Sequence, residues 1–135
     1  MTEVQIRTIK ETAKSTVIVL YIEKRTYYIR FPLDVKSSIF EAVIRVLRQI
    51  EDDIKFIIDT SYGVSSIAKD IKRDKWPKKL LKYSNIYGRL VTGRDVELTF
   101  KPLSPVDKEF AQKRAVDVTP IFKKSRSEEA QQKLF

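Results

Sequence analysis

The feature that most constrains the fold is the stretch "STVIVLYIEKRTYYIRFPLD", residues 15–34, where two runs of β-branched and aromatic residues flank a short charged break. Such runs, separated by a few polar residues, predict two antiparallel strands joined as a hairpin. With Lys24 and Arg25 as the loop, each strand residue has a defined partner across the hairpin. The expected pairs are Ile22–Tyr27, Leu20–Ile29 and Ile18–Phe31 on one face, and Tyr21–Tyr28 and Val19–Arg30 on the other.

The two faces of this hairpin differ in chemistry, because side chains alternate with period two along a strand. The first face is apolar and is the expected core face. The second face carries Tyr21, Tyr28 and Arg30, with Lys24 and Arg25 at the tip. It is either an exposed platform or a second core face under a helix. Because two-residue hairpin loops favour Gly or Asn, a longer loop and a bulge are alternatives to the Lys-Arg loop.

A long helix is expected after the hairpin. Ser38 and Glu41 have capping-box spacing, so the helix should begin near Ser38. Apolar residues then recur with helical period; they are Ile39, Val43, Val46, Leu47, Ile50, Ile54 and Ile57. The stretch "IKFIID", residues 54–59, fits either the end of this helix or a separate strand. We expect helix, since the periodicity continues in phase.

The second half of the chain predicts short elements. A helix over residues 64–75 should end before Pro77, which is well placed in the first turn of a second helix, "PKKLLKY". Residues 88–101 predict a hairpin that turns at 92–95. "SPVDKEFAQKR" predicts a helix with Ser104 as its N-cap. We therefore expect one α+β domain, residues 1–122, in which antiparallel β-hairpins form a small sheet packed against two to four helices.

Residues 123–135 form a polar stretch that we interpret as a C-terminal tail. Its last two residues, Leu134 and Phe135, are apolar, which makes them candidates for contact with a protein partner. A homodimer is a further option, because a second copy would double any binding surface.

Several kinds of chemistry are excluded by composition. The chain has no cysteine and no histidine, so disulfides, thiolate or imidazole metal sites, and Cys–His or Ser–His catalysis are absent. Its three glycines are far apart, so no phosphate-cradling loop is present. We expect no catalytic residue, no metal site and no cofactor. Carboxylates at Asp52, Asp70, Asp95 and Glu97 keep a metal-dependent nuclease as a minor alternative.

The expected location is the cytoplasm, or the host cytoplasm for a viral protein. Apolar runs are too short to span a bilayer, and the N-terminal residues "MTEVQIRTIKE" are too polar for a secretory signal. A basic amphipathic helix on a membrane surface is disfavoured, because the apolar helix faces are better explained as core. Abundant Lys, Arg and Glu with few thermolabile residues fit a thermophile, which suggests an archaeon or an archaeal virus as the source.

The charge balance favours a polyanionic partner. Lys and Arg number 27 against 18 Asp and Glu, which gives a net charge of +9 and an isoelectric point near 9.7. The stretch "DIKRDKWPKKLLKY", residues 70–83, places the only tryptophan, Trp76, among six basic residues. Cations that bind phosphates and aromatic faces on which bases stack are what single-strand binding requires.

The function expected from these patterns is non-catalytic binding of nucleic acid, DNA or RNA, with single strands favoured over duplexes. The candidate binding residues are Tyr21, Lys24, Arg25, Tyr28, Arg30, Lys72, Arg73, Lys75, Trp76, Lys78 and Lys79. The alternative is a protein–protein interaction module, such as an adaptor, an inhibitor or a virion or assembly component. In that case the same aromatic and arginine residues would be interface anchors.

Overall fold

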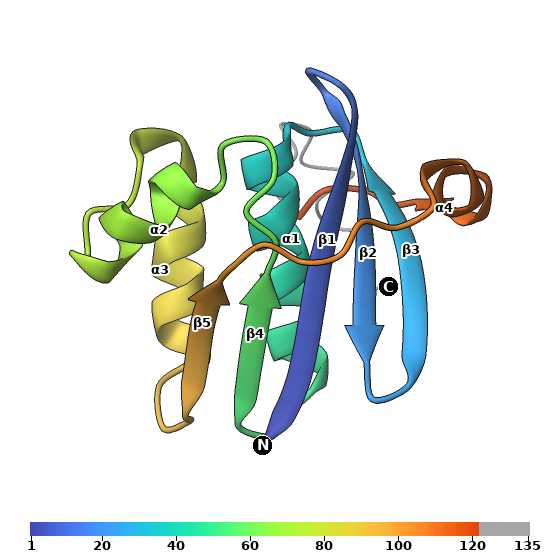
Figure 1. The fold of residues 1–135 in the computed structure, drawn as a ribbon. Coiled ribbons are helices and arrows are strands. Elements are labelled where there is room, and N and C mark those ends of the chain that lie inside the picture. The colour runs from blue at the N-terminus through green and yellow to red at the C-terminus, as the bar shows by residue number, and fades with distance from the viewer. Residues whose placement is uncertain (122–135) are drawn as a thin grey trace.

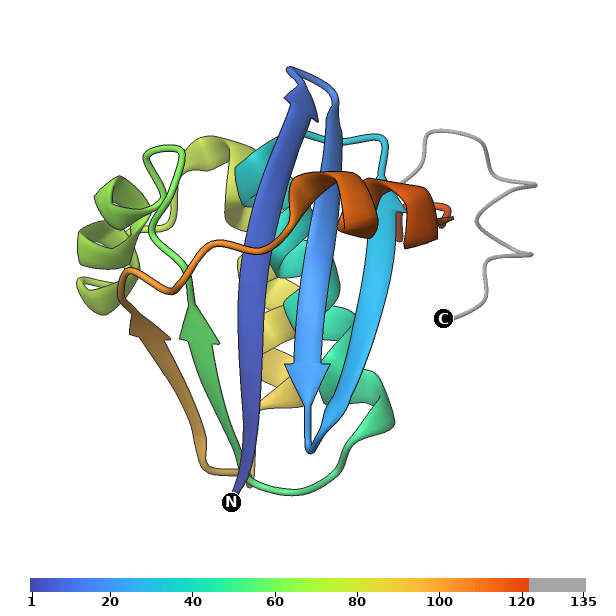
Figure 2. The ribbon, with the colours of Figure 1, turned by 45° about the vertical axis from the view of Figure 1, so that its right-hand side comes forward.

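A six-stranded mixed sheet forms the centre of the fold in the computed structural model, which describes residues 1–121 (Figure 1). Helices α1, α2 and α3 pack on one face of the sheet, and α4 packs on the other (Figure 2). The elements are β1 (Thr2–Thr12), β2 (Ser15–Ile22), β3 (Arg25–Phe31), α1 (Val35–Gln49), β4 (Ile54–Ile58), α2 (Ser65–Lys72), the 3-10 helix η1 (Lys78–Leu80), α3 (Leu81–Leu90), β5 (Val96–Phe100), α4 (Lys108–Arg114) and β6 (Val116–Asp117).

The strand order is β5-β4-β1-β2-β3-β6. Strands β1, β2 and β3 form an antiparallel meander, whereas β4 lies parallel to β1 on its other side, and β5 lies parallel to β4. The fold is therefore α+β, as the sequence predicted. Along the chain, β2 and β3 are added on one side of β1, and β4 and β5 are then added on its other side. Because β1, β4 and β5 are parallel, their carboxyl ends point to the same end of the sheet.

The predicted hairpin is present, but its loop is one residue earlier than expected. Glu23 and Lys24 form the two-residue turn, and both have positive φ, 51° and 84°. Such turns need positive φ at both central residues. The observed pairs are Ile22–Arg25, Tyr21–Thr26, Leu20–Tyr27, Val19–Tyr28 and Ile18–Ile29. The predicted pairing was thus wrong by two residues along the partner strand, a shift that leaves every side chain on its predicted face.

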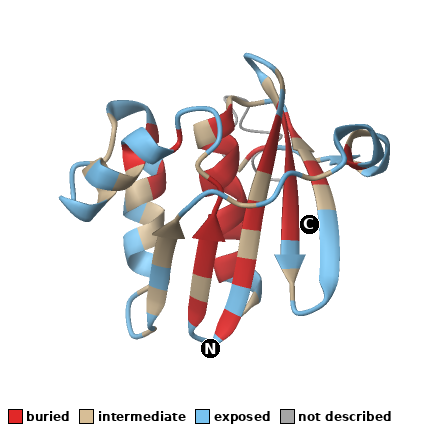
Figure 3. Ribbon diagram, viewed as in Figure 1, coloured by how far each residue is buried: buried red, intermediate tan, exposed pale blue. Residues whose placement is uncertain are grey.

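Both faces of the meander are covered over most of their length. On the α1 face, Ile18, Leu20 and Phe31 belong to the main core, which α1 closes. On the opposite face, Val17 and Val19 pack with Ile9 beneath Ala111 of α4. Buried residues therefore run along β1, β2, β4 and α1 (Figure 3). The second face of the hairpin is a smaller core rather than an open platform.

The long helix is present with different ends. Asp34 is the N-cap of α1, and its side chain accepts a hydrogen bond from the Ser37 amide, so the predicted start at Ser38 was wrong. The Ser38 hydroxyl instead donates to the Asp34 carbonyl. Residues 54–58 form strand β4, so the expected helix there was also wrong. The apolar residues of β4 are buried between β1 and β5, and periodicity cannot separate such a strand from a buried helix.

The later elements follow the predicted pattern in part. The break at Pro77 is confirmed, because α2 ends at Lys72 and η1 begins directly after Pro77. The predicted hairpin over residues 88–101 was wrong: the first part of it belongs to α3, and β5 pairs with β4 in parallel. Helix α4 is confirmed, but its N-cap is Asp107 rather than Ser104. The predicted tail, with Leu134 and Phe135, lies outside the described residues.

Candidate nucleic-acid interface

Helix α2 and the chain that follows it carry seven exposed cations, which we call the basic segment. They are Lys69, Lys72, Arg73, Lys75, Lys78, Lys79 and Lys82. Asp74, with a positive φ of 56°, ends α2, and the Lys75 amide donates back to the Asp70 carbonyl. The chain therefore turns here, and η1, a few residues further on, carries two more exposed lysines, Lys78 and Lys79.

Most cations of the basic segment have no acidic partner. Lys79 pairs with Asp34 at 2.5 Å, and the ammonium of Lys82 lies 5.4 Å from the ring centroid of Tyr83. Over residues 1–121 no ion pair involves the other five cations, which are Lys69, Lys72, Arg73, Lys75 and Lys78. Unpaired, exposed cations at this density are suited to contacts with phosphate groups.

Asp34 links the basic segment to α1. Partial burial alone would raise the pKa of the Asp34 carboxyl, but its bonds to the Lys79 ammonium and to Ser37 outweigh burial and lower that pKa. Asp34 therefore stays charged at neutral pH. It caps α1 and fixes Lys79 at the same time.

Trp76 is anchored at the boundary of the main core. Its ring centroid lies 4.9 Å from that of Phe40 and 5.7 Å from that of Tyr87, and the residue is partly buried. Burial also raises the pKa of the Tyr87 hydroxyl. Both rings line an open hollow of about 600 Å³ between α2, α3 and β5. Only the uncovered part of the Trp76 indole is thus available to a ligand.

The candidate residues of the first hairpin fall into two groups. Tyr21 is 42% exposed on the outer face, and Lys24 and Arg25 are exposed at the tip. Tyr28 lies against Phe110 of α4, with ring centroids 5.8 Å apart in an edge-on arrangement. Helix α4 therefore covers Tyr28 in part, and a continuous platform of Tyr21 and Tyr28 does not form.

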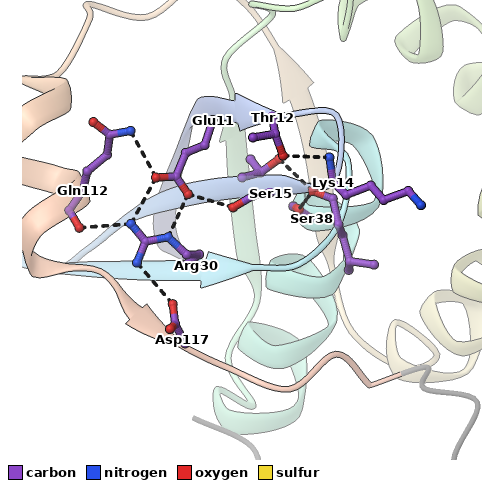
Figure 4. Close-up of polar contacts among 10 residues, drawn as sticks. Glu11, Thr12, Lys14, Ser15, Arg30, Ser38, Gln112 and Asp117 are labelled. Carbon is purple, nitrogen blue, oxygen red and sulfur yellow. Dashed lines mark hydrogen bonds and ion pairs between the residues drawn. The ribbon is translucent and has the colours of Figure 1, made fainter.

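All three guanidinium nitrogens of Arg30 contact other residues of the protein (Figure 4). Its Nε donates to Glu11 Oε1 at 2.7 Å, and its Nη2 donates to Glu11 Oε2 at 3.0 Å and to the Gln112 carbonyl at 3.1 Å. Its Nη1 contacts Asp117 at 3.2 Å. The hydrogen bond from Arg30 lowers the pKa of Glu11 to about 2. Arg30 thus joins β1, β3, α4 and β6, and this structural role explains its position better than phosphate contact does.

The structure keeps the two predicted clusters apart. The hairpin tip with Lys24 and Arg25 lies at one end of β2 and β3, whereas the basic segment lies beyond the opposite ends of the strands, next to β4 and β5 (Figures 1 and 2). Lys72, Arg73, Lys75, Lys78 and Lys79 lie on α2, on η1 and on the short connection between these two elements. A single contact surface therefore includes the basic segment but not the tip.

A further pocket was not anticipated. It has a volume of about 310 Å³ and lies beyond the carboxyl end of β4, beside the middle of β1, and its polar lining includes Arg7, Asp59, Tyr62, Ser104 and Lys108. These residues come from three distant parts of the chain, so only the sheet topology brings them together. Within the sequence, only Asp59 pointed to this pocket, because it is a carboxylate that directly follows the apolar residues of β4 and precedes the polar stretch "TSYG".

The acidic residues considered for a nuclease are dispersed. Asp53 Oδ1 accepts a hydrogen bond from the Asp95 amide at the amino ends of β4 and β5, while Asp70 lies on α2. In the part of the chain that the structure describes, no three Asp, Glu, His or Cys side chains are grouped so as to hold a metal ion. Within that same part, every helix is too short or too polar to cross a membrane.

No model of a known protein family matches the chain, and a search of curated proteins likewise gives no match. Functional inference therefore depends on the geometry described above.

Proposed function

We propose that this chain binds nucleic acid without catalysing a reaction on it, and that single strands bind better than duplexes. The observation that carries the proposal is the set of five exposed cations of the basic segment that have no ion-pair partner within residues 1–121. Each cation that neutralises a phosphate releases condensed counterions, which favours binding. Lys72, Arg73, Lys75 and Lys78 are the main proposed contacts.

The preference for single strands is supported by the aromatic residues beside the basic segment. Trp76 and Tyr87 border the hollow between α2, α3 and β5. An unpaired base can stack on such a ring, at roughly 1–3 kcal/mol per base, whereas bases of an intact duplex are already stacked on one another. Arg30 and Tyr28 are not part of this proposed surface, because the Glu11 network and α4 already occupy them.

Fluorescence anisotropy with labelled oligonucleotides tests the proposal. The oligonucleotides would be single-stranded and duplex DNA and RNA, titrated between about 50 and about 200 mM salt. Each phosphate contact on a single strand contributes roughly 0.7 to the slope of log affinity against log salt. A triple variant, Lys72→Ala with Arg73→Ala and Lys75→Ala, should therefore lower that slope by about 2.

A matched control removes three exposed lysines elsewhere, with Lys10→Ala, Lys14→Ala and Lys113→Ala. It lowers the net charge by the same amount, so it should change the slope far less than the triple variant of the basic segment does. Equal effects of the two variants would assign binding to net charge rather than to the basic segment. Absence of binding to every oligonucleotide at low salt would overturn the proposed function.

The second candidate function is a protein–protein interaction module, as an adaptor, an inhibitor or an assembly component. The observation that favours it is the apolar part of the same hollow, where Leu81 is 48% exposed and Ile71, Val91 and Leu98 are partly exposed. Trp, Tyr and Arg are the residue types that dominate binding energy at protein interfaces. A chain that binds no oligonucleotide would make this candidate the better one.

A further inference from the structure

The pocket beyond the carboxyl end of β4, beside the middle of β1, has a position that is typical of ligand sites. In open sheets with parallel strands, ligands bind beyond the carboxyl ends of strands at the point where the strand order reverses. That point here is the boundary between β1 and β4, since the meander runs to one side and β5 lies on the other. The segment that leads from β5 to α4 passes beyond the ends of β5 and β4 and over the face of β1 (Figure 2), and it supplies Ser104 to the pocket.

Asp59 provides a buried carboxylate in this pocket. The residue is only 7% exposed, and its amide donates to the Ile6 carbonyl of β1. Its Oδ1 accepts a hydrogen bond from the Leu103 amide at 2.9 Å. Among the described residues, no cation pairs with Asp59 and no donor bonds to its Oδ2. Oδ2 is not among the fully buried polar atoms of the described residues that lack a partner, so it is open to a hydrogen-bond donor from a ligand in the pocket.

The same pocket contains cations. Arg7 donates from Nε to the Ser104 carbonyl at 2.8 Å, from Nη2 to the Ser104 hydroxyl at 3.1 Å and from Nη1 to Gln5 Oε1 at 2.9 Å. A guanidinium has five N–H donors, so two remain for a ligand while the others hold the group in place. Lys108 is exposed on the same lining.

The pocket lining also includes an aromatic residue, Tyr62. Tyr62 is 42% exposed and has a left-handed backbone with a φ of 59°, in the loop that leads from β4 to α2. The residues that follow begin α2, so the pocket and the basic segment are connected by this short helix.

We infer that this pocket binds one ribonucleotide of a single strand, with Asp59 accepting a hydrogen bond from the ribose 2′-hydroxyl. Arg7 and Lys108 contact its phosphate, and Tyr62 contacts its base. A simple anion would be repelled by Asp59, and a simple cation by Arg7 and Lys108, whereas a nucleotide supplies both a hydroxyl donor and an anion. The inference rests on the proposed function and adds a preference for RNA over DNA.

Matched oligonucleotides test this inference on the full chain. RNA, DNA and 2′-O-methyl RNA of one sequence differ only at the 2′ position, so they isolate the Asp59 contact. RNA should bind about tenfold more tightly than the other two, as expected for one hydrogen bond to a charged group. Asp59→Asn should reduce this preference to about threefold, because a charge-assisted bond is roughly twice as strong as a neutral one. DNA affinity should be unchanged.

Asp59→Asn retains an oxygen that can accept from the Leu103 amide, so the local fold should persist. The control is Asp53→Asn, in which the changed carboxylate also accepts a backbone amide, that of Asp95, at the other edge of the sheet. This control should keep the full RNA preference. If Asp59→Asn does not fold, the comparison of RNA with 2′-O-methyl RNA on the unchanged chain still decides the question.

The outcomes separate this inference from the proposed function. Equal binding of RNA and DNA, or full RNA preference in Asp59→Asn, overturns the ribose contact and leaves the proposed function intact. An RNA preference that disappears when EDTA removes divalent cations would assign the pocket to a bound cation and also overturn it. Failure of both RNA and DNA to bind overturns the proposed function itself.

Discussion

Two arginines illustrate how environment decides the role of a residue. Arg30 and Arg7 lie on neighbouring parts of the meander, and both use several N–H donors within the protein. Arg30 bonds the carboxylates of Glu11 and Asp117, so its charge is neutralised. Arg7 bonds only neutral oxygens, those of Ser104 and Gln5, so its charge stays available to an anion. Arg7 is therefore the better candidate for a phosphate contact.

The Glu11–Arg30 pair predicts a pH-dependent contribution to stability. The pKa of Glu11 is about 2 in the folded chain, compared with an ordinary value of 4.5. The unfolded chain thus takes up this proton at higher pH than the folded chain does. The stabilisation is fully present above about pH 4.5 and is lost as the pH falls through about 2.

The measurement is urea unfolding of the wild type and of Glu11→Gln. The free energy of unfolding should be lower for the variant at about pH 7, and the difference should shrink progressively toward about pH 2. A difference that stays constant across this range would show that Glu11 acts through packing rather than through its charge.

At the scale of elements, α1 organises the molecule. Its apolar side closes the main core, and two fully buried charged residues, Glu41 and Arg45, lie on it as well. Glu41 accepts a hydrogen bond from the Ile121 amide at 2.7 Å, and Arg45 donates to the Thr119 carbonyl. The segment after β6 is therefore fastened to α1 by polar contacts, which a helix with an entirely apolar inner face could not provide.

The cap of α1 can be separated from its ion pair by two substitutions. Asp34→Ala removes both the N-cap acceptor and the partner of Lys79, whereas Asp34→Asn keeps an acceptor and removes only the charge. We expect Asp34→Ala to lower the free energy of unfolding by about 1–2 kcal/mol. Asp34→Asn should cost less than about 1 kcal/mol, since exposed ion pairs contribute little.

Urea unfolding near neutral pH measures both changes. If the two variants lose the same stability, the ion pair with Lys79 rather than the cap would be the important contact. A larger loss for Asp34→Asn than for Asp34→Ala would contradict the assignment of Asp34 as N-cap.

At the scale of the whole molecule, stability should be unevenly distributed. Strand β2 is covered by α1 on one face and by α4 on the other, and its residues 16–20 are all buried. By contrast, α2 has one buried residue, Ile67, and the basic segment is exposed. Regions with few buried contacts open locally at low free-energy cost.

Amide hydrogen exchange should therefore be slowest in β1, β2 and β4 and much faster in α2. Under conditions where opening is reversible, the β2 amides should report the global free energy of unfolding. Addition of a binding oligonucleotide should slow exchange in α2 more than in the hairpin tip at Glu23 and Lys24. Equal exchange rates in α2 and β2 would contradict this distribution.

Local patterns determined part of this fold. The hairpin was predictable because alternation along residues 15–31 assigns each side chain to a face, and these faces survive the error in its loop. Pro77 directly precedes η1, a position that suits its fixed φ and its missing N–H. The charge of the basic segment was also evident, because exposed cations need no partner from elsewhere in the chain.

What the sequence alone determined about this protein is thus its local elements, the two faces of its hairpin and its basic character. The tertiary structure decided that residues 54–58 form a strand, that α4 covers Tyr28, that Glu11 engages Arg30 and that Asp59 lies in a pocket with Arg7. Each of these depends on contacts between residues far apart in the chain. Such contacts follow from strand order and packing, which periodicity within a short window does not encode.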